Sequence, residues 1–174
     1  MKKILLLICI IGLFTPATLH AQDRANVFRH GKLDNGLTYY VRHTSMQPGK
    51  ADFYLVQNVG ALMEEDNQNG LAHFLEHMAF NGSESFKEGI PNFLKRRGVT
   101  RFNAQTGQDE TVYYMTAIPT NDTKLLDSCL LVMKDWSGFL LLKPDEIDKE
   151  RGVIREERRI RRNLGARLKE QSDP

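Results

Sequence analysis

The chain has 174 residues, which is enough for one domain with a hydrophobic core, and its formal net charge is +2 at pH 7. Lys2 and Lys3 account for this excess of basic residues, so the charge offers no argument for binding nucleic acid. Residues 22–174 contain one cysteine, Cys129, which excludes a disulfide within that part of the chain. Cys129 lies in an apolar helical stretch, and we expect it to be a buried core residue.

Residues 1–21 have the pattern of a secretory signal peptide. The basic start is followed by an apolar run over residues 4–14 and by small residues before Gln22. This run is shorter than the roughly 20 residues that a membrane-spanning helix needs. We therefore expect an exported protein, periplasmic or secreted, in which residues 22–174 form one domain and are not inserted in a membrane.

Strands are expected before residue 60. Residues 32–33 and 37–43 flank Asn35-Gly36, which is a strong signal for a β-hairpin. Residues 52–59 alternate between apolar and polar side chains, as is typical of a strand. Residues 60–69 are polar and include three acidic side chains, so we expect a loop there.

His73, Glu76 and His77 form an H-x-x-E-H motif, the reverse of the H-E-x-x-H order of zinc proteases. On a helix, residues three and four apart share one face, so the two imidazoles can bind one metal ion and the Glu76 carboxylate lies beside it. Glu76 is thus the candidate general base, which would take a proton from a water molecule that the metal activates. We expect four apolar residues on the other side of this helix to pack into the core: Leu71, Phe74, Leu75 and Met78.

Helices and strands alternate after the motif. Residues 90–97 are expected to form a short helix with a proline in its first turn. Residues 101–106 and 111–118 have the pattern of two strands joined by a turn, and at least one of Tyr113 and Tyr114 should lie in the core.

Two longer helices are expected near the C-terminal end. The first is capped by Asn121 or Asp122 and runs to about Phe139. Its inward residues are expected to be Leu125, Leu126, Cys129, Leu130, Val132, Met133 and Trp136. Pro144 begins the second. The whole pattern is that of an α+β protein, with strands of hairpin type and interleaved helices.

Three blocks of sequence resemble the pitrilysin/insulinase family of zinc metallopeptidases, peptidase family M16. They are residues 70–82, which contain the H-x-x-E-H motif, residues 102–106 with 110–114, and residues 150–157. The resemblance covers roughly residues 28–162. It implies a largely antiparallel sheet backed by helices, a bound Zn²⁺ ion, and endopeptidase activity on peptides or unfolded polypeptides.

The resemblance also assigns site residues. His73 and His77 match the first two zinc ligands, and Glu157, which lies 80 residues after His77, matches the third. Glu150 matches a supporting carboxylate in the catalytic machinery, where an acceptor of this kind orients a histidine ring.

Glu156 competes with Glu157 for the role of third ligand, because the two are adjacent in the sequence. Helix geometry favours Glu157, since it follows Glu150 by seven residues and shares a face with it and with Val153 and Ile154. Glu156 points about 100° away from that face.

Asn103 and Ala104 match the edge strand with which the family binds the substrate backbone by strand addition. Ala104 is small, so a substrate chain could approach closely, and Asn103 could form a hydrogen bond with a peptide group. The resemblance therefore implies a role in substrate binding for both residues.

Members of this family are usually larger, with two homologous halves that close around the peptide in one chain or in two subunits. The resemblance thus implies that this chain is the N-terminal catalytic portion, truncated at the C-terminal end of its domain, and that a second half or subunit completes the enzyme. Two alternatives stay open: a non-catalytic subunit of the same fold that binds peptides or serves in assembly, and an inactive fragment.

Residues 155–167 are rich in arginine, but acidic residues are interleaved with them, so we expect a solvated helix face and no binding of nucleic acid.

Overall fold

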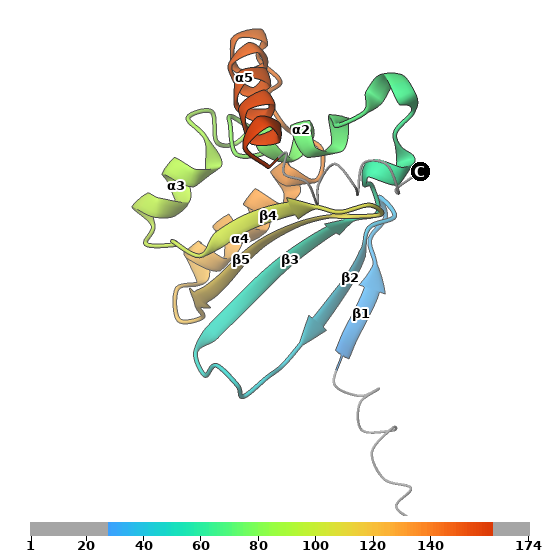
Figure 1. The fold of residues 1–174 in the computed structure, drawn as a ribbon. Helices are drawn as coiled ribbons and strands as arrows, with labels where there is room; N and C mark the ends of the chain where they lie inside the picture. Colours follow the sequence, from blue (N-terminus) through green and yellow to red (C-terminus); the bar gives the residue numbers. More distant parts are fainter. Residues whose placement is uncertain (1–27, 162–174) are drawn as a thin grey trace, which may run out of the picture. The chain divides into compact units, whose positions relative to one another are not determined.

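The computed structural model describes residues 28–161, shown as the coloured ribbon in Figure 1. The predicted signal peptide at residues 1–21 and the arginines beyond residue 161 lie outside the described residues. The chain forms two units, residues 1–46 and residues 47–174, and each is described by itself.

The first unit contains the predicted hairpin. Strand β1 (Phe28–Lys32) pairs antiparallel with β2 (Thr38–Arg42), in a register that places Phe28 opposite Arg42 and Lys32 opposite Thr38. The side-chain oxygen of Asn35 accepts a hydrogen bond of 3.1 Å from the Leu37 amide, and Gly36 has a φ of +89°, which a residue without Cβ adopts at little cost. The Asn-Gly signal therefore marks the turn correctly.

The second unit is built on a three-stranded antiparallel sheet. Its strands are β3 (Lys50–Gln57), β4 (Phe102–Thr106) and β5 (Thr111–Pro119), and they lie in the order β3-β5-β4. Strand β5 is central and β4 is at an edge of this sheet. The three strands lie where the sequence predicts them. Gly107 donates a hydrogen bond of 2.8 Å to Glu110, which closes the turn between β4 and β5.

Four helices and two short 3₁₀ turns complete the described part of the second unit, residues 47–161. The helices are α2 (Leu71–Met78), α3 (Ile90–Arg96), α4 (Thr123–Trp136) and α5 (Pro144–Arg161), and the turns are η1 (Ala61–Met63) and η2 (Asp66–Gln68). The side chain of Asp122 accepts a hydrogen bond of 3.0 Å from the Leu125 amide and thereby caps α4. The fold is thus the α+β arrangement that the sequence predicts.

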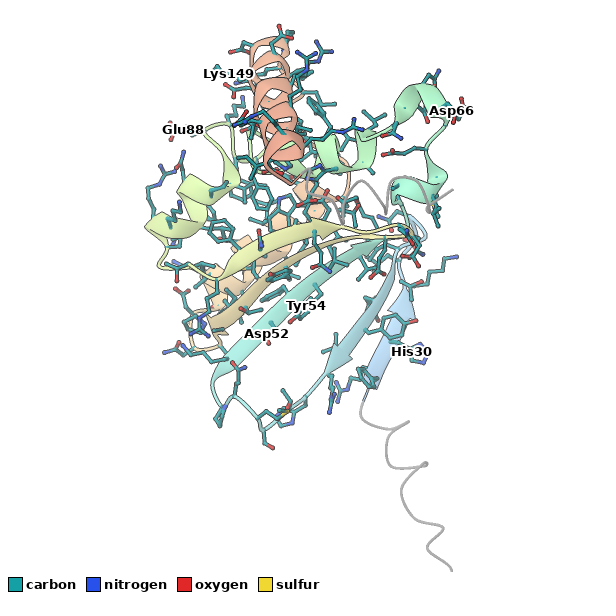
Figure 2. The ribbon with its side chains drawn as sticks, in the orientation of Figure 1. His30, Asp52, Tyr54, Asp66, Glu88 and Lys149 are labelled. Carbon is teal, nitrogen blue, oxygen red and sulfur yellow. The ribbon has the colours of Figure 1, made fainter. Side chains whose placement is uncertain are left out.

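The core lies between α4 and the sheet: Figure 1 shows α4 behind the sheet, and this helix contacts β5 and β3. Tyr113, Met115 and Ile118 of β5 are buried in one cluster with α4 residues, among them Cys129, as predicted. On the other face of the sheet, Tyr54 projects from β3 (Figure 2), is 61% exposed and stacks on the Tyr114 ring. Within the described residues, the side of the sheet that faces α4 is therefore buried in the core, and the other side is exposed to solvent.

Three leucines that were expected in the core are exposed: Leu71 and Leu75 on α2, and Leu130 on α4. Leu130 lies about 100° from the buried stripe, whose spacing of four, three and four residues through Leu125, Cys129, Val132 and Trp136 fixes the inward face of α4.

Helix α2 buries only part of the expected face: Met78 is buried and Phe74 partly buried, as expected, whereas Leu71 and Leu75 are exposed. Its buried residues are Ala72, Glu76 and Met78, because the helix contacts β4 on one side and α5 on another. The carboxylate of the motif, rather than Leu71 and Leu75, is turned toward the sheet. Val153 of α5 is also 46% exposed, so Ile154 alone of the two expected neighbours is partly buried between Glu150 and Glu157.

Candidate metal centre

The loop before α2 is held against the β4–β5 turn. The Ala61 and Leu62 amides donate hydrogen bonds of 3.1 and 2.8 Å to the carbonyl oxygens of Gly107 and Gln108. Gly60 makes this approach possible, since a Cβ atom there would lie 2.5 Å from the Gln108 oxygen. These contacts fix the position of the start of the loop that leads into α2.

Glu64 caps the start of α2. Its two carboxylate oxygens accept hydrogen bonds of 2.6 Å each, one from the Gly70 amide and one from the Ala72 amide. A negative charge at a helix N-terminus is also favourable for the helix dipole. Sequence reasoning left Glu64 in a polar loop, because a cap that reaches back six residues has no local sequence signature.

The two motif histidines face each other from successive turns of α2. The Nε2 atoms of His73 and His77 are 3.1 Å apart, and their rings are nearly perpendicular at 88°. Two tetrahedral ligands with bonds of about 2.05 Å to zinc would lie about 3.3 Å apart. The spacing of the two nitrogens therefore suits a shared metal ion.

Glu157 approaches both histidines from α5. Its Oε2 atom is buried and lies 3.8 Å from Nε2 of His73 and 3.8 Å from Nε2 of His77. One ligand atom from each of the three residues lies within 4.8 Å of the others, and the three side chains are half-buried. Two imidazole nitrogens and one carboxylate oxygen are a donor set that Zn²⁺ accepts, with a fourth position left open.

Glu156 does not take part in this cluster. It is exposed and forms an ion pair with Arg159, whose guanidinium lies 2.6 Å from Oε1 of Glu156. The hydrogen bond from Arg159 lowers the pKa of the Glu156 carboxyl. The structure therefore places Glu157, and not Glu156, beside the two histidines. In the described part of the arginine-rich segment, Glu156 and Arg159 thus form an exposed ion pair, as expected for a solvated helix face.

Glu150 contacts the second histidine. Its Oε1 atom lies 2.7 Å from Nδ1 of His77, and both side chains are 17% exposed. A hydrogen bond from Nδ1–H to this carboxylate leaves the Nε2 lone pair of His77 directed at the three-residue cluster.

The Glu76 carboxylate is 8% exposed and faces β4. Its Oε2 atom accepts a hydrogen bond of 2.6 Å from the hydroxyl of Thr106, the last residue of β4. Sequence reasoning missed Thr106, although it ends the quoted block 102–106. Burial, and secondly the charge of Glu76, raises the pKa of Tyr113 to about 12, so this phenol stays neutral beside the carboxylate.

Asn103 and Ala104 lie in β4 with opposite orientations. Asn103 is exposed and opposite Tyr114 in the sheet register, whereas Ala104 is 6% exposed and packs in the core. The Ala104 side chain therefore cannot provide the open approach that its small size suggested. What β4 offers a peptide is its backbone at the edge of the sheet and the exposed side chain of Asn103.

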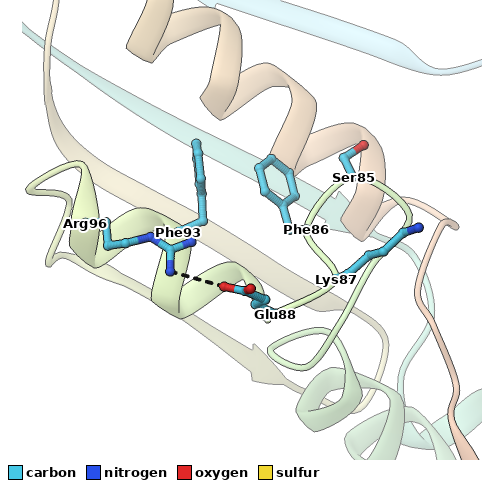
Figure 3. A pocket seen from close by; sticks show the side chains of 7 residues that line it. Ser85, Phe86, Lys87, Glu88, Phe93 and Arg96 are labelled. Carbon is cyan, nitrogen blue, oxygen red and sulfur yellow. Dashed lines mark hydrogen bonds and ion pairs between the residues drawn. The ribbon is translucent and has the colours of Figure 1, made fainter.

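A hollow of about 300 Å³ lies elsewhere, near α3 (Figure 3). Ser85, Phe86, Phe93 and Arg96 are among its lining residues, and Arg96 is ion-paired with Glu88 at 3.4 Å. None of the metal-type donors on α2 and α5 lines it, so this hollow is not the candidate site.

In the part of the chain that the structure describes, no helix has the length and apolar character to cross a membrane.

The fold brings two histidines and one glutamate together as a candidate metal site, and comparison with known proteins gives the family of the chain. Residues 34–164 match the model of the insulinase family, peptidase family M16. The chain belongs to this family, and the resemblance seen in its three sequence blocks is confirmed.

Among individual relatives, the chain is 38% identical over 137 residues to the probable zinc protease PqqL of Haemophilus influenzae and 32% identical over 161 residues to the zinc protease PqqE of Helicobacter pylori. These matches cover 76% and 92% of the chain, but 15% and 35% of the relatives. The crystal structure of the periplasmic protease PqqL from Escherichia coli matches with a TM-score of 0.75 and 33% identity, over 83% of this chain and 16% of that one. The chain thus spans only a minor part of the length of these relatives.

Proposed function

We propose that this chain carries the metal site of a zinc-dependent endopeptidase that hydrolyses peptides or unfolded polypeptides. The observation that supports this most strongly is the convergence of Glu157 of α5 with His73 and His77 of α2. Family membership and the relatives named zinc proteases favour the same function.

His73, His77 and Glu157 would hold the ion, and Glu150 would orient His77 through its Nδ1 atom. Zinc in such a site makes a water molecule acidic near neutral pH and polarises a carbonyl group. Glu76 accepts the proton of the attacking water and passes it to the leaving amine. Its burial limits competition from bulk solvent, which strengthens the hydrogen bonds of the carboxylate.

The substrate would bind as an added strand along β4, where Asn103 is exposed. An added strand must be extended, so peptides and unfolded segments fit this mode and compact folded proteins do not. Because the chain spans a minor part of its relatives, a second homologous half or subunit would hold the other side of the substrate.

Export of the protein is part of the proposal. The signal-peptide pattern at residues 1–21 supports it, and the Escherichia coli relative is described as periplasmic. Release of the mature chain into the periplasm after expression in a bacterial host, with the N-terminus at Gln22, would test both the cleavage site and the compartment.

Zinc content and cleavage of an unstructured fluorogenic peptide, measured on the same preparations, test the proposed function. The wild-type chain should bind one zinc ion and cleave the peptide. Glu76→Gln should retain the zinc and lose at least about 100-fold in kcat, because an amide cannot accept the proton. Glu156→Gln is the matched control and should behave as wild type. Cleavage by Glu76→Gln at the wild-type rate would rule out Glu76 as the base.

A non-catalytic subunit of the same fold is the second candidate. Such a protein would bind the same peptide without cutting it, even with zinc bound. Peptide binding by fluorescence anisotropy, with no product after prolonged incubation, would select this alternative.

A further inference from the structure

We infer that Thr106 is a positioning residue that holds the Glu76 carboxylate in the orientation needed by a general base, an inference that rests on the proposed function. The Thr106 hydroxyl donates a hydrogen bond of 2.6 Å to Oε2 of Glu76. Within residues 28–161, this hydroxyl is the side-chain donor that the Glu76 carboxylate uses. The contact links the edge strand β4 directly to the middle of the motif helix.

A carboxylate that acts as a base must present one oxygen in a fixed direction. Rotation of the Glu76 carboxylate exchanges its two oxygens, and the terminal torsion of glutamate is broad and intrinsically poorly defined. With Oε2 held by Thr106, Oε1 is the oxygen available to accept a proton. Since Glu76 is 8% exposed, water competes weakly for Oε2, and a hydrogen bond to an ionised group is stronger than one between neutral groups.

The hydroxyl of Thr106 is itself constrained by its neighbour in the sheet. Thr111 lies opposite Thr106 in the register of β4 and β5. The Thr111 hydroxyl donates its proton to the Val59 carbonyl at 2.8 Å, and its contact with the Thr106 oxygen is longer, at 3.4 Å. Each hydroxyl has a single proton. Thr111 therefore uses its proton on Val59, and Thr106 gives its own to Glu76.

The position of Thr106 at the end of β4 ties the base to the strand proposed to bind substrate. Asn103 lies three residues earlier on the same strand, and the turn at Gly107–Glu110 is closed by a backbone hydrogen bond. The backbone that would pair with the peptide and the hydroxyl that orients the base thus belong to one rigid segment. This relation gives Thr106 a role beyond the packing of a half-buried side chain.

Four single variants of the full chain, and one double variant, test the inference. Thr106→Val removes the hydroxyl at nearly constant volume, Thr106→Ser keeps it, and Thr116→Val makes the same change on β5 without a contact to Glu76. We expect Thr106→Val to lower kcat on the order of tenfold with KM and zinc content unchanged, since the lost interaction acts on the reacting base and not on substrate binding. Thr106→Ser should restore kcat to within about threefold, and Thr116→Val should match wild type. Wild-type kcat in Thr106→Val, or no rescue by serine, would overturn the inference.

The fourth variant, Glu76→Gln, gives a readout that does not depend on activity. Urea unfolding of wild type, Thr106→Val, Glu76→Gln and the double variant forms a thermodynamic cycle. The effect of Thr106→Val on the unfolding constant should shrink at least about threefold in the Glu76→Gln background, because the charge-assisted bond is already lost. Strictly additive effects would overturn the inference. A wild-type chain that binds zinc but does not cleave would instead overturn the proposed function, while the cycle would still decide the Thr106 contact.

Discussion

Glu150 on α5 lies 2.7 Å from the Nδ1 atom of His77 on α2, on the side of the ring away from the candidate metal ligands. The contact joins two helices that are distant in the sequence, and it sets which nitrogen of His77 carries the proton. A carboxylate in this position fixes the direction of the imidazole ring.

Removal of this carboxylate should weaken metal binding without abolishing it. We expect Glu150→Ala to lower zinc affinity by about 10–100-fold, as is usual for the partner of a metal-binding histidine. Competition with a chromophoric chelator at pH 7.5 measures the affinity. Asp148→Ala is the control, since Asp148 is exposed and pairs with Arg151 on the same helix. An unchanged affinity in Glu150→Ala would show that the His77 contact is incidental.

Removal of the candidate third ligand should have a larger effect. We expect Glu157→Ala to lose at least about 100-fold in zinc affinity, because a bond to the metal disappears rather than the orientation of one ligand. Glu156→Ala makes the same chemical change one residue away, on an exposed side chain paired with Arg159. Equal zinc content and affinity in Glu157→Ala and wild type would mean that the third ligand is misassigned.

The parts of this site that the sequence predicts are those that depend on helix periodicity or on a conserved order of family blocks. His73 and His77 share a helix face by spacing alone, and the family resemblance selects Glu157 among several glutamates of α5. The hairpin at Asn35-Gly36 and the cap at Asp122 are equally local, and both are found as predicted.

The parts that the sequence does not predict depend on contacts between segments. The Thr106–Glu76 hydrogen bond joins residues 30 positions apart, and no periodicity relates them. Helix α2 contacts both β4 and α5, and in this position Glu76 is buried while Leu71 and Leu75 are exposed. Periodicity identifies opposite faces of a helix, but which face is buried depends on the neighbouring elements.

The cap at the start of α2 should contribute measurably to stability. We expect Glu64→Ala to lower the free energy of unfolding by about 1–2 kcal/mol, because two amides at the helix start lose a charged acceptor. Urea unfolding followed by circular dichroism measures the change. Glu88→Ala is the control, since its ion pair with Arg96 is exposed and such pairs contribute little. A Glu64→Ala chain as stable as the control would contradict a role for the cap.

The alkaline limit of stability should depend on Tyr113. Burial, and secondly the negative charge of Glu76, raises the pKa of this phenol from 10.0 to about 12. The folded protein therefore holds the phenolic proton more tightly than the unfolded chain does. This contribution is fully present below pH 10 and is lost as the pH rises from about 10 to about 12, by up to about 3 kcal/mol.

Unfolding in urea at pH 9 and at pH 11.5 measures this loss. Tyr113→Phe has no group to ionise at this position, so its stability should fall less between the two pH values than that of wild type. Tyr54→Phe removes an exposed phenol instead and should keep the wild-type pH dependence. Part of the loss should remain in every variant, because burial also raises the pKa of Cys129, from 9.0 to about 11. If Tyr113→Phe and wild type lost equal stability, Tyr113 would not be the group that titrates, and the charge of Glu76 would not act on it.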